Sequence, residues 1–510
     1  MASSLTKDSP RTPGPEKTFF GHPRGLATLF MTEMWERFSF YGMRALLTIY
    51  LISGGPDATK GLQGGGLGMD LATTTAIYSI YLSMVYLLAM PGGWLADRLW
   101  GPRKTVAIGS CTIMVGHLTL AVPGQGTFFG GLVLVALGSG LLKANISTMV
   151  GHLYKGTDDP RRDGGFTIFY MGINIGAFFA PLIIGTVGET YNWHLGFALA
   201  AVGMALGLVQ FLIGTKSLSP ESSRVPTPLS AEERASWLRK GLGWLLVAVL
   251  VYGFVGLSGH FTLNWAMIPL TVAGLVIPAG VLVRIKRDKD LSRAEQTKMS
   301  GYIWFFVAAA VFWMIYDQGG STVQAFGTNK AAGEVLGIGF PSSWYQSLNP
   351  VFIMALAPVA AWFWLWLNRR GKEPATVAKF AAGLFLVGVS FFFFLIPLAM
   401  AAGGTGDGHL VSPMWLVGIY LIQTVGELCL SPVGLSVTTK MAPAKYASQM
   451  MGVWFLAVTA GDSVTGLLSI GGVDLGRTGV VTLEGLLAAL AGVAVFMYRR
   501  RVRELMGDIH

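Results

Sequence analysis

The sequence predicts an all-α integral membrane protein with fourteen spanning helices, arranged as two six-helix bundles with two extra helices between them. Of the 510 residues, 52% are hydrophobic and 13% are charged, whereas soluble domains carry about 25% charged residues. Apolar stretches long enough to cross a bilayer as a helix, which takes about 20 residues, recur along nearly the whole chain. The short alternating segments of a membrane β-barrel are not found.

The predicted spans form groups of six, two and six. The first bundle is expected at residues 27–53, 74–96, 104–122, 127–151, 165–187 and 194–214. The two extra helices are expected at 241–259 and 263–285, and the second bundle at 301–323, 341–368, 376–400, 412–436, 447–470 and 479–498. Residues 216–240 are polar and rich in Pro and Ser, which is typical of a linker. We therefore expect an N-terminal bundle over 26–214, a linker with the extra helices over 215–300, and a C-terminal bundle over 301–500.

The charge distribution predicts the orientation in the membrane. Most of the 37 Lys and Arg residues fall in the tails and in alternate loops that face one side, which is the positive-inside pattern. Residues 1–25 are polar and Pro-rich and lack the apolar run of a signal peptide, so we expect a disordered cytoplasmic tail there and a second tail at 501–510. The net charge of +10 then reflects topology rather than a nucleic-acid partner. Cys111 and Cys429 lie in separate apolar segments, and no disulfide is expected.

A charged loop, GGWLADRLWGPRK at residues 92–104, joins the second and third predicted spans. Asp97 falls at the C-terminal end of its helix, where the helix dipole disfavours an anion, so it needs an arginine or a helix N-terminus of the other half as partner. A contact that forms in one conformation and breaks in another predicts a conformational latch of Asp97, Arg98 and Arg103; a solvated turn is the alternative. The loop resembles the signature loop of the major facilitator superfamily, which implies two bundles packed around a central site.

The segment EMWERFSFYGMR, residues 33–44, places four charges inside the first predicted span. Its charged and aromatic residues are spaced three and four apart and therefore share one stripe of a helix: Glu33, Glu36, Arg37, Phe40, Tyr41 and Arg44. Each charge at the bilayer centre costs about 2.5–3.5 kcal/mol on insertion scales. The stripe must therefore face protein or a water-filled cavity.

Four further ionisable residues lie inside other predicted spans: Lys143, Asp317, Glu427 and Asp462. Together with the first stripe they predict a polar cavity between the halves, in which at least one carboxyl can take a proton. Burial favours the protonated form of a carboxyl, and a neighbouring arginine favours the ionised form. Buried ion pairs that only fix helix packing are the alternative, although such pairs often add little net stability. For Asp462 two interpretations remain open, an additional protonatable site or a neutral, hydrogen-bonded acid.

Several motifs agree in order and spacing with one family. EMWERFSFYG at 33–42 resembles the ExxERFxYYG motif of the proton-dependent oligopeptide transporters, and three further segments are similar to other motifs of that family: FYMGINIGAF at 169–178, SLNPVFI at 347–353 and GELCLSPVGL at 426–435. The similarity runs from about residue 22 to 500. It implies a bacterial inner-membrane symporter that imports di- and tripeptides by alternating access, with protons as the coupling ion and no cofactor.

The resemblance also implies roles for single residues. Glu33, Glu36 and Arg37 would form the proton-coupling cluster, and Lys143 and Asp317 would form a pair across the halves that makes and breaks. The peptide would be held by residues of both halves: its amino group by Glu427 with Asn174 and Asn349, its carboxylate by Arg44 and Lys143, and its side chains beside Tyr41, Tyr81 and Trp454.

This sequence departs from the family pattern at Phe40, Ala144, Ala177 and Asp317, and none of these departures removes a charge. The partners expected are therefore di- and tripeptides, protons and the lipid bilayer, without nucleic acid, and the functional unit is expected to be a monomer. A related carrier of another small anion or zwitterion, such as nitrate or an amino-acid conjugate, is the alternative, as is a transport-inactive membrane sensor. An enzyme is not expected, because no nucleophile–base pair stands out in the sequence. Neither a Walker loop nor an HExxH motif is present, so ATP-driven transport and zinc proteolysis lack support.

Overall fold

The computed structural model describes residues 18–54, 65–154, 159–403 and 410–506. Within these residues the chain is helical apart from its loops and two hairpins of two-residue strands. The prediction of an all-α membrane protein is thereby confirmed.

The first half contains a π-helical continuation of two of its spans. Its elements are α1 (Gly25–Ile52), α2 (Leu71–Leu87), α3 (Ala89–Leu95), η1 (Ala96–Trp100), α4 (Pro102–Leu120), α5 (Gln125–Gly151), α6 (Arg162–Ala180), η2 (Pro181–Gly185), α7 (Thr186–Thr190) and α8 (Trp193–Gly214). The π-helical turn η1 ends the second span, and the π-helical turn η2 lies within the fifth. A strand pair, β1 (Thr18–Phe19) and β2 (His22–Pro23), precedes α1.

The insert between the halves begins with two short helical turns, η3 (Thr215–Ser217) and η4 (Pro220–Ser223). Its two long helices are α9 (Ala231–Leu257) and α10 (Asn264–Lys286). The start of α9 is fixed by a capping box, in which Ser230 and Glu233 satisfy each other's backbone amides.

The second half contains one span that is broken near its middle. Its elements are α11 (Arg293–Tyr316), η5 (Asp317–Gly320), α12 (Thr322–Lys330), β3 (Glu334–Val335), β4 (Ile338–Gly339), η6 (Ser342–Ser347), α13 (Leu348–Arg369), α14 (Thr376–Gly403), α15 (Met414–Met441), η7 (Ala444–Tyr446), α16 (Ala447–Ile470), α17 (Thr478–Met497) and α18 (Arg499–Met506). The 3₁₀ turn η5 interrupts the seventh span at Asp317.

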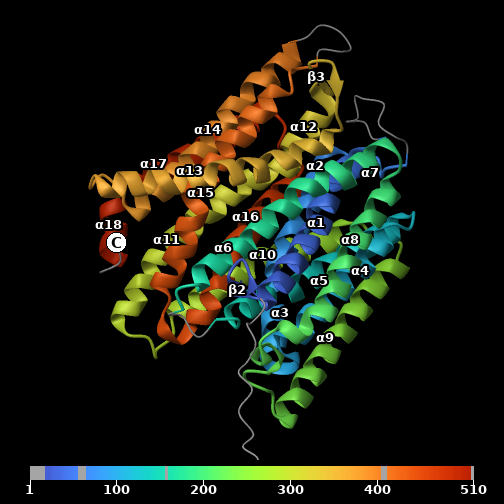
Figure 1. The fold of residues 1–510 in the computed structure, drawn as a ribbon. Helices are drawn as coiled ribbons and strands as arrows, with labels where there is room; N and C mark the ends of the chain where they lie inside the picture. Colours follow the sequence, from blue (N-terminus) through green and yellow to red (C-terminus); the bar gives the residue numbers. More distant parts are fainter. Residues whose placement is uncertain (1–17, 55–64, 155–158, 404–409, 507–510) are drawn as a thin grey trace, which may run out of the picture.

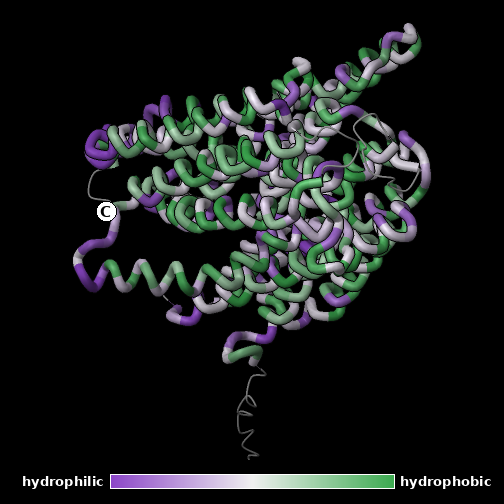
Figure 2. The backbone as a smooth tube through the Cα atoms, turned by 90° about the horizontal axis from the view of Figure 1, so that it is seen from above, coloured by the Kyte–Doolittle hydropathy of each residue, from purple (hydrophilic) through white to green (hydrophobic). Residues whose placement is uncertain are grey.

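Twelve helical segments among the described residues are long and apolar enough to cross a membrane. Helices α1 and α4 occupy the other two predicted spans but are not among these twelve; α1 carries the four charges of residues 33–44. Figure 2 shows hydrophobic residues along the long helices and hydrophilic residues mainly near their ends. Long apolar helices with hydrophilic residues near their ends are typical of a multi-pass membrane protein.

Helices α2, α10 and α16 lie side by side between the two halves (Figure 1). One end of the molecule carries β1, β2, α18 and the start of α9, and is called the terminal end below; the opposite end carries α7, α12 and β3, and is called the distal end. The Ser83 hydroxyl of α2 lies 2.8 Å from that of Ser463 on α16, and Gly274 of α10 leaves no room for a side chain against these two residues. The insert is thus packed onto the seam between the halves.

Both expected tails are corrected in part. Residues 18–25 do not form a disordered tail: β1 and β2 pair, the ring of Phe19 lies 5.8 Å from that of Phe30, and His22 Nδ1 lies 3.1 Å from the Tyr154 hydroxyl. Residues 501–506 belong to α18, whose Val502 and Met506 are buried. Apolar side chains at these positions give both segments a surface to pack on. Residues 1–17 and 507–510 lie outside the described part of the chain.

Candidate functional site

The proton-coupling residues predicted on α1 form a buried cluster. Arg37 Nε lies 3.0 Å from Glu33 Oε1 and 2.5 Å from Glu36 Oε2. All three side chains are at least 96% buried. Two carboxyls therefore share one guanidinium in a site without access to water, so the cluster has one negative charge too many when both are ionised. Such an arrangement is able to hold one proton.

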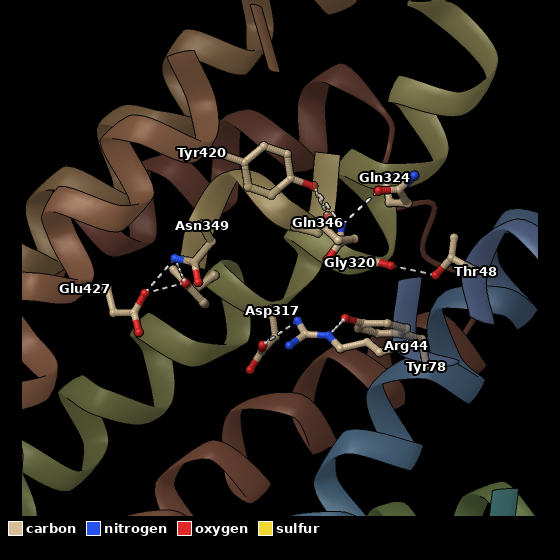
Figure 3. Close-up of polar contacts among 12 residues, drawn as sticks. Arg44, Thr48, Tyr78, Asp317, Gly320, Gln324, Gln346, Asn349, Tyr420 and Glu427 are labelled. Carbon is tan, nitrogen blue, oxygen red and sulfur yellow. Dashed lines mark hydrogen bonds and ion pairs between the residues drawn. The ribbon is translucent and has the colours of Figure 1, made fainter. Parts of the chain in front are cut away.

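Arg44, one stripe position further along α1, joins the two halves. Its Nη2 lies 3.2 Å from Asp317 Oδ1 on η5, and its Nε donates to the Tyr78 hydroxyl at 2.5 Å (Figure 3). The pair is largely buried, with 15% and 8% of the two side chains exposed. The predicted partner of Asp317 was Lys143; in this conformation Asp317 instead pairs with Arg44.

The break at η5 positions Asp317 because its freed carbonyls are bonded by side chains. Thr48 of α1 donates to Gly320 O at 2.6 Å, whereas Tyr420 and Gln346 donate to Gly319 O at 2.5 and 3.0 Å (Figure 3). Irregular backbone at membrane depth is tolerated only when its polar groups are satisfied in this way. A side chain at Gly320 would clash with the Tyr78 ring, so this position requires glycine.

Lys143 on α5 faces an aromatic pair that spans the halves. Its Nζ lies 3.4 Å from the centre of the Tyr86 ring and 5.5 Å from that of Phe455. The two rings are stacked, with centres 5.8 Å apart. A cation over ring faces is stabilised by their quadrupoles, and Lys143 also lies close enough to Glu33, Glu36 and Asp317 for their charges to interact. Its charge therefore acts on both the α1 cluster and Asp317.

Glu427 on α15 is held by a network of the second half. Its Oε2 accepts hydrogen bonds from the Tyr316 hydroxyl at 2.5 Å and from Asn349 Nδ2 at 2.9 Å (Figure 3). Asn349 also lies 3.1 Å from the Thr424 hydroxyl. The two predicted residues Glu427 and Asn349 are thus brought together, and Glu427 forms no ion pair with another described residue.

Other predicted contact residues are placed less uniformly. Tyr41 is half-buried beside Arg44, and Tyr81 is buried with its ring stacked on Phe40. Asn174 donates to Tyr170 O of its own helix at 3.1 Å. Trp454 was expected to line a pocket for peptide side chains, but it is 3% exposed and packs on Gly434 and Phe380 inside the second half.

Two residues that the sequence did not single out reach the interface. Phe455 follows Trp454 and presents its ring to Tyr86 and Lys143. Tyr170 on α6 is half-exposed and lies close enough to Glu427 for their charges to interact. Tyr170 falls in the motif segment FYMGINIGAF, so the sequence offered a reason to consider it. Phe455 lies in no motif, and it faces the interface only because of how α16 is rotated, which the sequence does not indicate.

The predicted latch residues contact the insert rather than the other half. Arg98 Nη2 lies 3.2 Å from Glu233 Oε1 at the start of α9, and Arg103 donates to the carbonyls of Leu218 and Ser219 at 3.4 and 3.3 Å. The Asp97 carboxylate is exposed and has no ion-pair partner among the described residues. A latch between the halves is therefore not formed here.

The halves are instead joined at the distal end. The Glu189 carboxylate on α7 accepts three hydrogen bonds from the start of η6: from Ser342 N at 3.0 Å, Ser342 Oγ at 2.9 Å and Ser343 N at 2.7 Å. Trp344 Nε1 donates to the Thr186 hydroxyl at 2.8 Å, and Ser347 Oγ donates to Phe178 O at 2.8 Å. These bonds close the seam between the first and second halves at that end.

The chemistry available at the site is binding and proton transfer. Within the described residues, no three His, Cys, Asp or Glu side chains gather as a metal site would require. Cys111 and Cys429 are free thiols, as expected. The site combines cations of the first half, Arg44 and Lys143, with the Glu427 carboxyl of the second half, which forms no ion pair among the described residues.

Known proteins share both the sequence and the fold. A family model described as "PTR2: POT family" matches residues 103–470. The "Uncharacterized transporter YclF" of Bacillus subtilis (strain 168) is 45% identical over 88% of this chain and 88% of its own. The "Di-/tripeptide transporter" of Lactococcus lactis subsp. cremoris is 39% identical over 97% of this chain and 98% of its own. A crystal structure of a variant of the peptide transporter POT in complex with alafosfalin is 42% identical and has a TM-score of 0.88, with 97% of this chain and 98% of the other covered.

Proposed function

The chain belongs to the POT family, and we propose that it is a proton-coupled symporter that imports di- and tripeptides across the bacterial inner membrane by alternating access. The observation that carries the proposal is the separation of charge between the halves. Arg44 and Lys143 come from the first half, and Glu427 comes from the second. A zwitterionic peptide has the same separation between its carboxylate and its amino group.

Recognition of the peptide ends leaves the side chains free. The amino group binds Glu427, where Asn349 and Tyr316 already orient the carboxylate. The peptide carboxylate binds Arg44 and Lys143. Since charge-assisted hydrogen bonds are about twice as strong as neutral ones, the two ends supply most of the affinity, and side chains need only tolerant surroundings.

Protons couple to transport through the α1 cluster. Because Glu33 and Glu36 share Arg37, one of them carries a proton while the other forms the ion pair. The charge of Lys143 acts on both Glu33 and Glu36. A peptide carboxylate that binds Lys143 offsets this positive charge. The proton held by the cluster therefore depends on the presence of substrate.

The orientation and assembly follow from the charge pattern. We place the terminal end, which carries the first and last described residues, in the cytoplasm, because most basic residues fall in segments predicted to face that side. With the distal end closed by Glu189, we expect peptide to enter and leave the site on the cytoplasmic side in this conformation. The charged site residues described above come from a single chain, and the proposed functional unit is a monomer.

The test is uptake of labelled dialanine into proteoliposomes, with and without an inward proton gradient. Unlabelled tripeptide, free alanine and nitrate serve as competitors. Gradient-driven uptake that only the tripeptide blocks is the expected result. Uptake blocked by nitrate would point to an anion carrier, and no uptake in well-reconstituted liposomes would overturn the proposed substrate.

Two variants separate binding from coupling. Glu427→Gln keeps the hydrogen bonds of Asn349 and Tyr316 but removes the charge, so peptide affinity should fall about 10- to 100-fold, as expected for a charged hydrogen bond. Glu36→Gln should lose gradient-driven uptake while exchange without a gradient remains. Glu484→Gln, which neutralises a buried carboxyl on α17, is the matched control. Equal loss of both activities in Glu36→Gln would contradict a coupling role.

A further inference from the structure

Asp462 lies in the seam between the halves. It is 1% exposed on α16. Its neighbour Ser463 lies 2.8 Å from the hydroxyl of Ser83 on α2, and Thr465 one turn on donates to Met314 O of α11 at 3.1 Å. The Asp462 carboxyl is therefore enclosed between α2 of the first half and the end of α11. The contact residue on α11, Met314, lies three residues before Asp317 in the chain.

The charges that act on Asp462 are those of the pair between the halves. Asp317 and Arg44 interact with it electrostatically, and so does the phenol of Tyr78. Lys143 acts on Asp317 but is not among the groups that act on Asp462. Helices α10 and α15, which also pack on α16, contribute no such charge among the described residues.

The charge of one guanidinium acts on both aspartates. Arg44 forms its ion pair with Asp317 (Figure 3), and the Oδ2 atoms of Asp317 and Asp462 are both buried without a hydrogen-bond partner among the described residues. An isolated ionised carboxylate is too costly to bury and takes up a proton instead. Of the two carboxyls, therefore, only one is ionised, and the other carries a proton.

We propose that Asp462 is a second proton carrier of the transport cycle, which exchanges one proton with Asp317 and thereby sets whether Arg44 of the first half pairs with η5 or with α16 of the second half. With the proton on Asp462, Asp317 is ionised and pairs with Arg44 as seen here. When the proton moves from the Asp462 carboxyl to the Asp317 carboxylate, Asp462 becomes the anion that attracts Arg44, and the ion pair between α1 and η5 gives way to one between α1 and α16. Arg44 keeps its charge throughout.

The proposal deepens the proposed function and rests on it for the transport assay. In proteoliposomes, Asp462→Asn fixes the neutral form, so the ratio of gradient-driven uptake to counterflow should fall about tenfold, within the usual range of coupling between two sites. The dependence of driven uptake on external pH should flatten. Asp462→Glu retains a carboxyl and should restore part of the ratio. Glu484→Gln should keep both the ratio and the pH profile.

A second measurement is independent of substrate. Infrared spectra of the purified protein report the carboxyl stretch of protonated acids. Asp462→Asn should remove one such band, and so should Asp317→Asn, because Arg44 then lacks a counterion and Asp462 ionises beside it. Glu484→Gln should not remove this band.

Several outcomes would overturn the proposal: spectra of Asp462→Asn that match the parent protein, an Asp462 band that persists in Asp317→Asn, or an unchanged pH profile of uptake. If the parent protein shows no peptide counterflow, the proposed function fails. The infrared comparison then still decides the role of Asp462.

Discussion

The two ends of this molecule join its halves in different ways. At the distal end the halves touch directly, through Glu189 with Ser342 and Ser343, and deeper in the membrane they touch through Arg44 with Asp317. At the terminal end, no hydrogen bond or ion pair among the described residues joins one half to the other. Each half is bonded there to the insert instead.

The insert contacts both halves at the terminal end. Its first part is held by Arg98, which pairs with Glu233. Its last part is held by Lys445 of the second half, whose Nζ lies 2.7 Å from Asp288 Oδ2 and 2.6 Å from Asp290 Oδ2. From this conformation, alternating access therefore needs bonds between the halves to break at the distal end but not at the terminal end. At the terminal end, the insert connects the two halves through its contacts with each of them.

The largest effect is expected from Arg44→Ala. The change leaves Asp317 buried without its cation, and breaking a buried ion pair typically costs about 3–5 kcal/mol. Thermal unfolding in detergent should show a clear loss of stability. Arg98→Ala, which removes the half-exposed pair with Glu233 at the terminal end, is the control. Equal losses in both variants would mean that the buried contact between the halves is no stronger than the exposed contact with the insert.

A smaller effect is expected from Glu189→Ala. The change removes the acceptor of three hydrogen bonds and should shift the population toward an open distal end about tenfold, since one charged hydrogen bond is worth about 1.5–3 kcal/mol. The measurement is alkylation of Ser347→Cys in a background without other cysteines, because Ser347 is buried in the closed seam. Glu232→Ala, an exposed carboxylate in the first turn of α9, should leave the rate unchanged. No increase in alkylation would contradict closure by Glu189.

The smallest effect is expected from Lys445→Ala at the terminal end. Because exposed ion pairs add little stability, the melting temperature should fall only slightly.

The contact of Asp288 with Lys445 should also resist mild acid. Hydrogen bonds from Lys445 and Tyr446 lower the pKa of Asp288. The contribution of Asp288 to folding stability is therefore full above the unfolded-state pKa of about 4 and is lost as the pH falls toward the lower folded-state pKa. Acidification from neutral pH to about 5 should therefore not release the insert, as hydrogen exchange of residues 287–291 would show.

Local spacing was enough to predict the elements and the first cluster. Glu33 and Arg37 are four residues apart on one helix, so their ion pair follows from helix geometry alone. The long apolar runs predicted the spans, and the motifs predicted the family. The structure of the tails could not be predicted from local spacing. Val502 and Met506 of α18 are buried, but the surface on which they pack exists only once the second half has folded.

The sequence by itself determined the membrane helices, the charges within them and the family. Only the tertiary structure decided that Asp317 pairs with Arg44 rather than Lys143. It also decided that Phe455 rather than Trp454 faces the seam. Finally, it placed Asp462 close enough to Arg44 for their charges to interact. The reason is that each choice depends on how helices far apart in the chain are rotated and how deep they lie. Adjacent residues on a helix point about 100° apart, and a bundle fixes that angle through the summed packing of all its neighbours.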